Sequence, residues 1–318
     1  MKEVSSILDI ILENSKALEK EILEGTTQDD ISKTDVILGD IIRENYAQSL
    51  MYQITEINPL KAPQGSIYTS RRNAETNKFE VIRTDVQTKT NTIITGFTQE
   101  VFQDMQKMFK ISAKNAMGKV LAGITAREEN STILRLLESE SITVPSLPMY
   151  DTNNLESTIL QLSKKVSESV IQMNQDTYKT LDSFCILPHS FAAAYLGSFS
   201  YMSEGKEKNL FVGRVGRTDY YINPFPNTSS EFDQSFDYSY EIEDTPIPNY
   251  CYVGLLNKTP GTSSIIFTPY LYERDYIIDP DTGENVVVLR NRYGVIPSPQ
   301  HEPLKNRSLL HKFQITKI

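Results

Sequence analysis

The chain carries the segment Ile57-Asn58-Pro59-Leu60-Lys61-Ala62-Pro63-Gln64-Gly65-Ser66-Ile67-Tyr68. Pro59 and Pro63 favour extended backbone here, because a proline disfavours helical geometry at the residue before it. From Gly65 to Thr95, apolar residues alternate with Thr, Arg, Lys and Asn, which is the two-residue period of a β-strand. The pattern predicts a long β-hairpin. It has too few apolar side chains for a core of its own, so we expect it to lie on another surface.

Helical periodicity is present on both sides of this hairpin. Apolar residues recur at helical spacing over residues 4–22 and 36–52 upstream, and over residues 113–141 and 154–178 downstream. An isolated helix as short as the first is marginal in water, so it needs a partner in its own chain or in another protein. From about Phe184 onward, strands and turns dominate. Helices and a hairpin followed by strands predict the α+β class.

The composition is that of a soluble protein of about two domains, at about 150 residues each, for a chain of 318 residues. No apolar run approaches the ~20 residues that cross a bilayer, and acidic residues interrupt the first apolar stretch, where a signal peptide needs an uncharged core. Cys185 and Cys251 are too few for a disulfide framework, although a single bridge stays open. We therefore expect a protein made in a reducing cytoplasm, with no membrane segment.

The charge of the chain is unevenly distributed. The net charge is −9, residues 1–60 hold 12 acidic and 5 basic side chains, and residues 285–318 hold 6 basic and 1 acidic. Complementary potentials steer association, so the acidic arm of one copy would meet the basic surface of another. The alternative is a solvated acidic helix and a basic tail without a partner. In both cases the negative total argues against broad affinity for nucleic-acid phosphates.

No residue pattern in the sequence predicts a catalytic pair or a calcium loop. Cys185 and His189 are four residues apart, but Pro188 prevents the helix that would bring thiol and imidazole together. Residues 279–284 place acidic side chains around a glycine, but this glycine is at the fifth loop position and calcium loops require it at the sixth. A β-turn between two strands explains this segment better.

Nucleotide and metal motifs are not found in the sequence either. Residues 213–217 combine glycine and arginine without forming a GxGxxG motif or a P-loop. His301 and His311 lie in a basic, proline-containing tail, and the three histidines of the chain are too few and too scattered for a metal site. We expect a protein without enzymatic activity and without cofactors.

The segment at residues 57–68 resembles the Q-P-M-x-x-P-T-G-x-I-F segment of the major capsid proteins of T4-like tailed bacteriophages. Further stretches resemble the same family in the same order, namely residues 118–139 its long spine helix, 186–196 a strand and helix, 210–224, 252–270 and 292–297 its later strand motifs, and 313–318 its closing strand. This shared order over residues 36–318 carries the resemblance. The chain is shorter than the T4 protein and has no room for its insertion domain.

The resemblance implies an HK97-like capsid fold of the α+β class. Its parts would be an N-terminal helix at residues 1–24, an N-arm at 25–58, an E-loop hairpin at 59–97, a peripheral domain with the spine helix at 98–150 and 262–318, and an axial domain at 151–261. In such shells the E-loop lies across a neighbouring subunit. That neighbour would supply the core that the hairpin lacks.

The resemblance also implies a structural function. The protein would be a major capsid protein that self-assembles into homo-hexameric capsomers and closes an icosahedral shell around the double-stranded DNA of a tailed phage. Scaffold, maturation protease, portal and vertex proteins would be its partners in the bacterial host cytoplasm, and the virion its final location. The DNA would be enclosed without sequence-specific binding. The alternative is a vertex paralogue of the same fold, which would form pentamers.

Precursors in this family lose an N-terminal segment to a protease that cuts after glutamate in an Ile/Leu-x-Glu context. Residues 22–24 read Ile-Leu-Glu and fit this pattern, as residues 11–13 and 136–138 do. We favour cleavage between Glu24 and Gly25, because the polar residues that follow give a protease access. The alternative is an arm helix that stays uncleaved.

Intersubunit contacts are expected from the basic residues of the E-loop. These are Arg71, Arg72, Lys78, Arg83 and Lys89, which would face Asp and Glu side chains of a neighbour. Exposed ion pairs contribute only about 0.2–1 kcal/mol each, so any stabilisation would come from several pairs together. The alternative for each residue is a solvated strand face.

Overall fold

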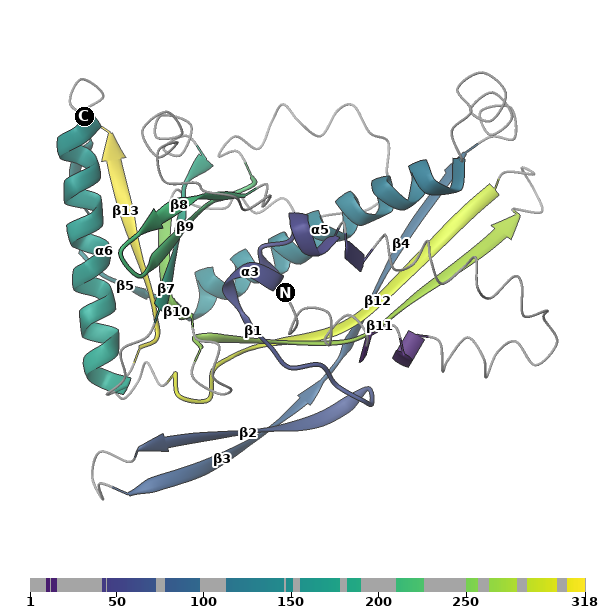
Figure 1. The fold of residues 1–318 in the computed structure, drawn as a ribbon, viewed down its shortest axis with the longest axis horizontal. Helices are drawn as coiled ribbons and strands as arrows, with labels where there is room; N and C mark the ends of the chain where they lie inside the picture. The colour runs from purple at the N-terminus through teal and green to yellow at the C-terminus, as the bar shows by residue number, and fades with distance from the viewer. Residues whose placement is uncertain are drawn as a thin grey trace. The chain divides into compact units, whose positions relative to one another are not determined.

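The structure of the chain is a computed structural model, shown as a ribbon in Figure 1. It describes residues 10–11, 13–15, 42–43, 45–72, 78–97, 113–145, 147–150, 155–177, 182–189, 210–225, 250–256, 263–278, 285–301 and 308–317. The chain divides into two compact units. The first unit comprises Met1–Tyr68, Arg83–Asn130 and Ile266–Ile296, and the second unit comprises Thr69–Ile82, Ser131–Ile265 and Pro297–Ile318.

The first unit is built on a four-stranded sheet in the order β1-β11-β12-β4 (Figure 1). Its strands are β1 (Glu56–Ile57), β4 (Lys89–Phe97), β11 (Ile265–Ile278) and β12 (Asn285–Pro297). β1 runs parallel to β11, and β4 runs antiparallel to β12. The short helix α3 (Met51–Ile54) precedes β1, and the long helix α5 (Ala113–Glu140) contributes its residues up to Asn130.

One side of α5 forms the core of the first unit. Leu121 and Ala122 of this helix are buried in a cluster with Ile93 of β4 and Leu289 of β12, which face each other in the strand ladder. The rest of the cluster is Ile11, Ile42, Tyr272 and Val287. Full burial of a large apolar side chain stabilises a fold by about 1.5–3 kcal/mol, so these contacts account for the position of the helix on the sheet.

The second unit is built on a seven-stranded sheet. Six strands follow the order β5-β13-β10-β7-β9-β8, and β6 pairs with β13 off this path. The strands are β5 (Ile142–Thr143), β6 (Leu147–Tyr150), β7 (Asp182–Leu187), β8 (Phe211–Val215), β9 (Thr218–Ile222), β10 (Tyr250–Leu256) and β13 (Leu310–Lys317). The chain ends in this sheet, because β13 pairs antiparallel with β10.

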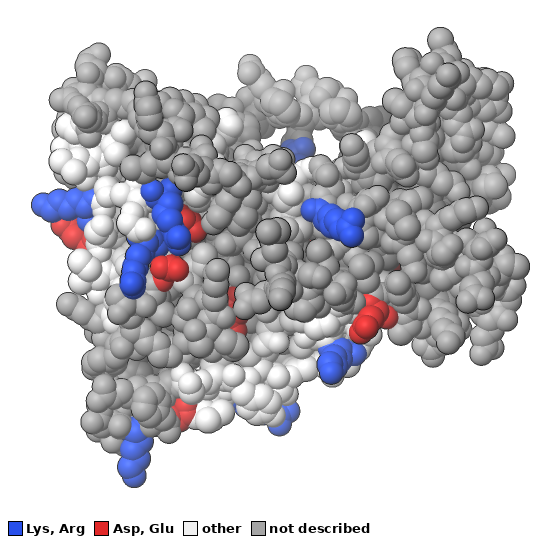
Figure 2. Space-filling view, in the orientation of Figure 1, with Lys and Arg blue, Asp and Glu red and all other residues white. Residues whose placement is uncertain are grey.

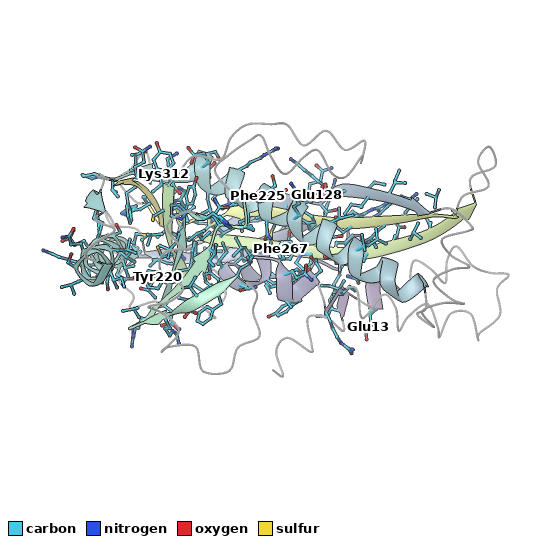
Figure 3. All side chains as sticks on the ribbon, turned by 90° about the horizontal axis from the view of Figure 1, so that it is seen from above. Glu13, Glu128, Tyr220, Phe225, Phe267 and Lys312 are labelled. Carbon is cyan, nitrogen blue, oxygen red and sulfur yellow. The ribbon has the colours of Figure 1, made fainter. Side chains whose placement is uncertain are left out.

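Helix α6 (Leu155–Thr177) supplies the helical side of the core of the second unit. Leu162, Val166 and Met173 recur at helical spacing and are buried together. The rest of the cluster is Cys185, Leu187, Val212, Tyr220, Cys251, Val253, Leu255, Leu309 and Phe313, of which Tyr220 is labelled in Figure 3. The predicted helices over residues 113–141 and 154–178 are thus confirmed as α5 and α6.

The predicted hairpin is a separate two-stranded sheet of β2 (Gln64–Arg72) and β3 (Phe79–Gln87), drawn at the bottom of Figure 1. Thr88 closes its base, because its backbone N–H and its Oγ1 hydroxyl both donate to the carbonyl of Pro63, each at 3.0 Å. These two bonds fix the point at which the chain leaves β3 and continues into β4.

The prediction that the hairpin continues to Thr95 is wrong. Residues 89–97 form β4, which pairs with β12 in the first unit. The physical reason is burial, since Ile93 of β4 lies in the core beneath α5 opposite Leu289. A third hairpin strand would leave this side chain in solvent.

Two glycines in the later strand motifs are explained by close packing. A Cβ on Gly254 of β10 would lie 2.5 Å from Cζ of Phe184. A Cβ on Gly294 of β12 would lie 2.7 Å from Oγ1 of Thr268 and 2.8 Å from Cγ1 of Val86. Real Cβ atoms do not make contacts this short, so these positions exclude side chains.

The two N-terminal helix predictions fall largely outside the described residues. Within them, residues 10–11 and 13–15 are helical, and so are residues 42–43 and 45–48. α3 follows after a short break. None of the helices in the described ranges combines the length and the apolar content that crossing a membrane requires.

Candidate assembly surfaces

The hairpin of β2 and β3 has one buried face and one open face. Side chains alternate between the two faces of a strand, and Ile67 and Val86 are buried. Tyr68 and Val81, by contrast, are 62% and 73% exposed. The open face of the hairpin therefore carries two large apolar side chains in contact with solvent.

Polar contacts join the two strands on the open face. Ser66 Oγ donates to Asp85 Oδ1 at 2.6 Å, and Arg83 Nε donates to Ser66 Oγ at 3.1 Å and to Asp85 Oδ1 at 2.9 Å. The hydrogen bonds from Ser66 and then Arg83 lower the pKa of Asp85, so the carboxylate stays charged. Arg83, one of the predicted intersubunit residues, therefore lies on the open face with its charge already paired within its own chain.

The other predicted contact residues lie on different elements. Lys78 precedes β3 and is exposed. Lys89 is also exposed, but it lies on β4 opposite Tyr293 of β12 and not on the hairpin, because β4 joins the first unit. Arg71 and Arg72 end β2, and their side chains lie outside the description. A role in intersubunit contacts stays a prediction for all of them.

The predicted cleavage site at Glu24 and Gly25 lies outside the described residues. The description resumes on the N-terminal side with residues 13–15, which are helical. Cleavage after Glu24 therefore stays a prediction.

The outer side of α6 is a second exposed surface. Leu160 and Ile171 are 72% and 56% exposed. Their separation of eleven residues is about three helical turns, so they lie on the same side of the helix, with exposed Lys164 and Glu168 between them. Sequence reasoning used only the buried stripe of this helix and missed this side. The signal was available, since both apolar residues fall outside the stripe.

Among the described residues, the cysteine and histidine side chains do not come together as a nucleophilic or metal-binding site. Cys185 is fully buried in β7, while His189 is exposed beyond the end of the strand. Burial raises the pKa of the Cys251 thiol, which disfavours a reactive thiolate. Within the described ranges, no three His, Cys, Asp or Glu side chains come together to hold a metal ion. Residues 279–284 lie outside these ranges, between the neighbouring strands β11 and β12.

Side chains of the second unit bind the C-terminal end of α5. Lys312 Nζ, labelled in Figure 3, donates to the carbonyl and to Oε1 of Glu138, both at 2.7 Å. Tyr252 OH donates to the other carboxylate oxygen at 2.6 Å. The last carbonyls of a helix have no partner within it, so the ammonium group satisfies one of them and its charge suits the negative helix end.

The two C-terminal histidines are structural. Nδ1 of His301 accepts the backbone N–H of Leu309 at 3.0 Å, so Nε2 carries the proton and donates to the carbonyl of Glu140 at 3.0 Å. Burial lowers the pKa of His301. Burial also lowers the pKa of His311 to about 4, with further effects from His301 and Lys165. Both rings are therefore neutral at pH 7.

A buried carboxylate links four segments of the first unit. Glu129 of α5 has no exposed surface. Asn45 Nδ2 donates to its two oxygens at 3.2 and 3.1 Å, Tyr272 OH donates at 2.9 Å, and Asn291 Nδ2 donates at 3.0 Å. The donors come from the arm before α3, from β11 and from β12. The carboxylate thus joins the helix to both long strands and to the arm.

Burial raises the pKa of Glu129 to about 7, and hydrogen bonds from Ser49, Tyr272 and Asn45 partly offset this rise. Sequence reasoning missed this residue. The signal is its position, because Glu129 follows Ala122 by seven and Ala126 by three residues and so falls on the buried side of the helix. A charged residue in an apolar helical stripe indicates a buried polar cluster.

Charges on the surface are mixed in sign. Figure 2 shows Lys and Arg interspersed with Asp and Glu over the described part of one face. One such pair joins neighbouring strands, with Arg214 Nε of β8 at 2.8 Å from Asp219 Oδ1 of β9. Opposite charges this close attract each other, so the pair supports the contact between the two strands.

No model of a known protein family matches the chain, and no curated protein matches its sequence. Solved structures do match. The crystal structure of a virus-like particle from Pyrococcus furiosus is 9% identical, with a TM-score of 0.52 over 88% of this chain and 98% of that chain. A structure from Microbacterium phage Oxtober96 is 7% identical, with a TM-score of 0.52 over 84% and 90%. One from Mycobacterium phage Ogopogo is 13% identical, with a TM-score of 0.51 over 85% and 92%.

These three similar structures come from a virus-like particle and from two phages. The chain therefore has a strand-rich α+β fold of the HK97-like capsid type, and the predicted fold class is confirmed. At sequence identities this low, the structural similarity establishes a shared fold and nothing further.

Proposed function

We propose that the chain is the major capsid protein of a T4-like tailed phage and that it forms hexameric capsomers of an icosahedral shell around double-stranded DNA. The observation that supports this most is the extent of the structural match, which covers 88% of this chain and 98% of the Pyrococcus furiosus particle protein. The protein would act through its shape and not as an enzyme.

The open face of the hairpin would be one intersubunit surface. Tyr68 and Val81 lose exposed apolar area when a neighbouring subunit covers them, which is the main favourable term in association. The basic residues Arg71, Arg72, Lys78, Arg83 and Lys89 would surround this contact. Obligate interfaces of this kind commonly bury about 2,000–5,000 Å² in total, so the hairpin would be one of several contacts.

The chain would divide into an N-arm (25–58), an E-loop (59–97), a peripheral domain (98–150 and 262–318) and an axial domain (151–261). In the structure β13 pairs with β10, so residues 310–317 share a sheet with strands of the proposed axial domain. Residues 1–24 would be either a propeptide cut after Glu24 or a permanent arm helix.

Partners would include scaffold, maturation protease, portal and vertex proteins, with assembly in the host cytoplasm and the virion as final location. The DNA would be enclosed without sequence-specific binding. The net charge of −9 supports this, because an inner wall that repels phosphates weakly does not trap the packaged genome.

Electron microscopy of the expressed chain, alone and with its scaffold, tests the proposal. We expect closed particles with six-fold capsomers. Five-fold assemblies alone would favour the vertex paralogue, and monomers under both conditions would contradict a shell function.

A further inference from the structure

Residues 10–11 and 13–15 near the N-terminus are helical and are inserted into the first unit. Ile11 has no exposed surface and belongs to the same apolar cluster as Leu121 of α5 and Val287 of β12. Ser15 is also fully buried, whereas Glu13, labelled in Figure 3, is exposed. One side of this segment is thus part of the fold, and the other faces solvent.

Two side chains of the segment bind main-chain groups. Asn14 Nδ2 donates to the carbonyls of Leu60 at 2.9 Å and of Tyr270 at 2.8 Å. Ser15 Oγ accepts the backbone N–H of Tyr272 at 3.1 Å. Both hydrogens of the Asn14 amide are therefore used, and an aspartate in its place would oppose two carbonyls with a group that only accepts.

These contacts extend the row of hydrogen bonds that other segments make to the main chain of strand β11. The strip after β1 reaches Pro269, whose carbonyl accepts the N–H of Leu60 at 2.9 Å. The carbonyl of Tyr270 and the N–H of Tyr272 follow on β11, and they are bound by the two side chains of the segment. Unbound main-chain groups on a strand attract other chains, so the segment completes this part of the sheet.

The covalent connection of the segment to its groove is long. The 26 residues 16–41 lie between the segment and Ile42, which is in the same cluster as Ile11. A fully extended chain of this length reaches about 85 Å, so its length alone does not fix the position of the segment. The segment is held by its own contacts.

We propose that the contacts of Ile11, Asn14 and Ser15 with the first unit form a peptide-binding groove, and that this groove keeps its ligand, the segment of residues 10–11 and 13–15, after the connection is cut. The groove selects an apolar side chain at Ile11, a double donor at Asn14 and a small hydroxyl at Ser15. The groove does not depend on the proposed capsid function. A natural cut after Glu24, by contrast, is expected only if the capsid proposal is correct. If this cut occurs, the cleaved segment stays bound in the groove.

A full-length chain with an endoprotease recognition site inserted between Glu24 and Gly25 tests the groove. The protein is folded and purified first, labelled at its N-terminus, and then cut. We expect the labelled fragment to co-elute with the remainder in size-exclusion chromatography, and an excess of synthetic peptide of residues 1–24 to displace it. Circular dichroism and hydrogen exchange report whether the remainder stays folded.

Two variants identify the contacts responsible. Asn14→Asp should release the fragment at least about tenfold faster, because two part-buried carbonyls lose their donor and face a carboxylate instead. Glu13→Gln, on the exposed side of the same segment, should not change the rate. Immediate separation of the fragment, loss of fold after the cut, or equal rates for the two variants would each overturn the groove. The experiment requires no shell assembly, so its failure leaves the capsid proposal intact.

Discussion

Gly254 of β10 lies directly opposite Phe184 of β7, and a Cβ on this glycine would come within 2.5 Å of the Cζ atom of the ring. On the other side of Gly254, Cδ2 of Leu310 in β13 would lie 2.9 Å from the same Cβ. The missing side chain therefore makes room for the two neighbours in the middle of the sheet. This is a packing requirement and does not involve unusual backbone angles.

Gly254→Ala should lower the free energy of unfolding by about 1–3 kcal/mol, the usual cost of overpacking a core. Gly123→Ala is the matched control, because its Cβ would meet only Gln48 Oε1, at 3.6 Å. Replacing glycine by alanine in the interior of a helix raises the free energy of unfolding by up to about 1 kcal/mol. Urea unfolding of both variants is the measurement, and shifts of the same sign and size would contradict the packing argument.

The two long helices and the hairpin could be predicted from the sequence, because their periodicity is local. The pairing of residues 89–97 with β12 could not be predicted, since a two-residue period indicates a strand but does not identify the strand with which it pairs. The pairing of Ile93 with Leu289 joins positions almost two hundred residues apart. Arg83 is different, because Asp85 two positions away must share its strand face, and this pairing was visible in the sequence.

Glu129→Gln should change the pH dependence of stability. The pKa of this buried carboxyl is raised from 4.5 to about 7, so its protonated form favours the folded state. The contribution of this carboxyl to the free energy of unfolding is fully present below pH 4.5 and is lost as the pH rises through 7. At about 1.4 kcal/mol per pKa unit the loss is about 3 kcal/mol. The wild type should therefore lose stability relative to the variant between pH 5 and 8, as measured by urea unfolding.

The exposed Glu168 on α6 provides the control for this experiment. Glu168→Gln should leave the difference from the wild type constant over the same pH range, because the group stays in solvent in both states. A constant difference for Glu129→Gln as well would mean that burial does not raise the pKa of its carboxyl.

His311→Leu should make the protein more stable than the wild type at acid pH. Burial is the main reason that the pKa of His311 is lowered to about 4. A neutral ring in the folded state contributes stability above the ordinary pKa of about 6.5, and this is lost as the pH falls through 4. As the pH falls from 7 to 4, the free energy of unfolding of the leucine variant should rise by up to about 3 kcal/mol relative to that of the wild type. His189→Leu, at an exposed position, should show no such trend in thermal unfolding, and a parallel trend would contradict the assignment.

Local patterns could not reveal the polar cluster or the groove. Glu129 was detectable as a charged residue on a buried helix side, but its donors Asn45, Tyr272 and Asn291 come from distant segments. The N-terminal helix was predicted to need a partner, and the structure supplies it from the same chain, at β11. Which partner a helix finds depends on long-range packing, which a single sequence does not encode locally.

Val81→Glu should block shell assembly without weakening the subunit. Val81 is 73% exposed on the open face of the hairpin, so a charge there costs the isolated chain less than about 0.5 kcal/mol. In an interface the same charge is buried without a partner and opposes association. Gln87→Glu adds the same charge to an exposed position of the same strand and should assemble. Sedimentation and electron microscopy distinguish particles from free subunits, and normal particles from Val81→Glu would show that no neighbour covers this face.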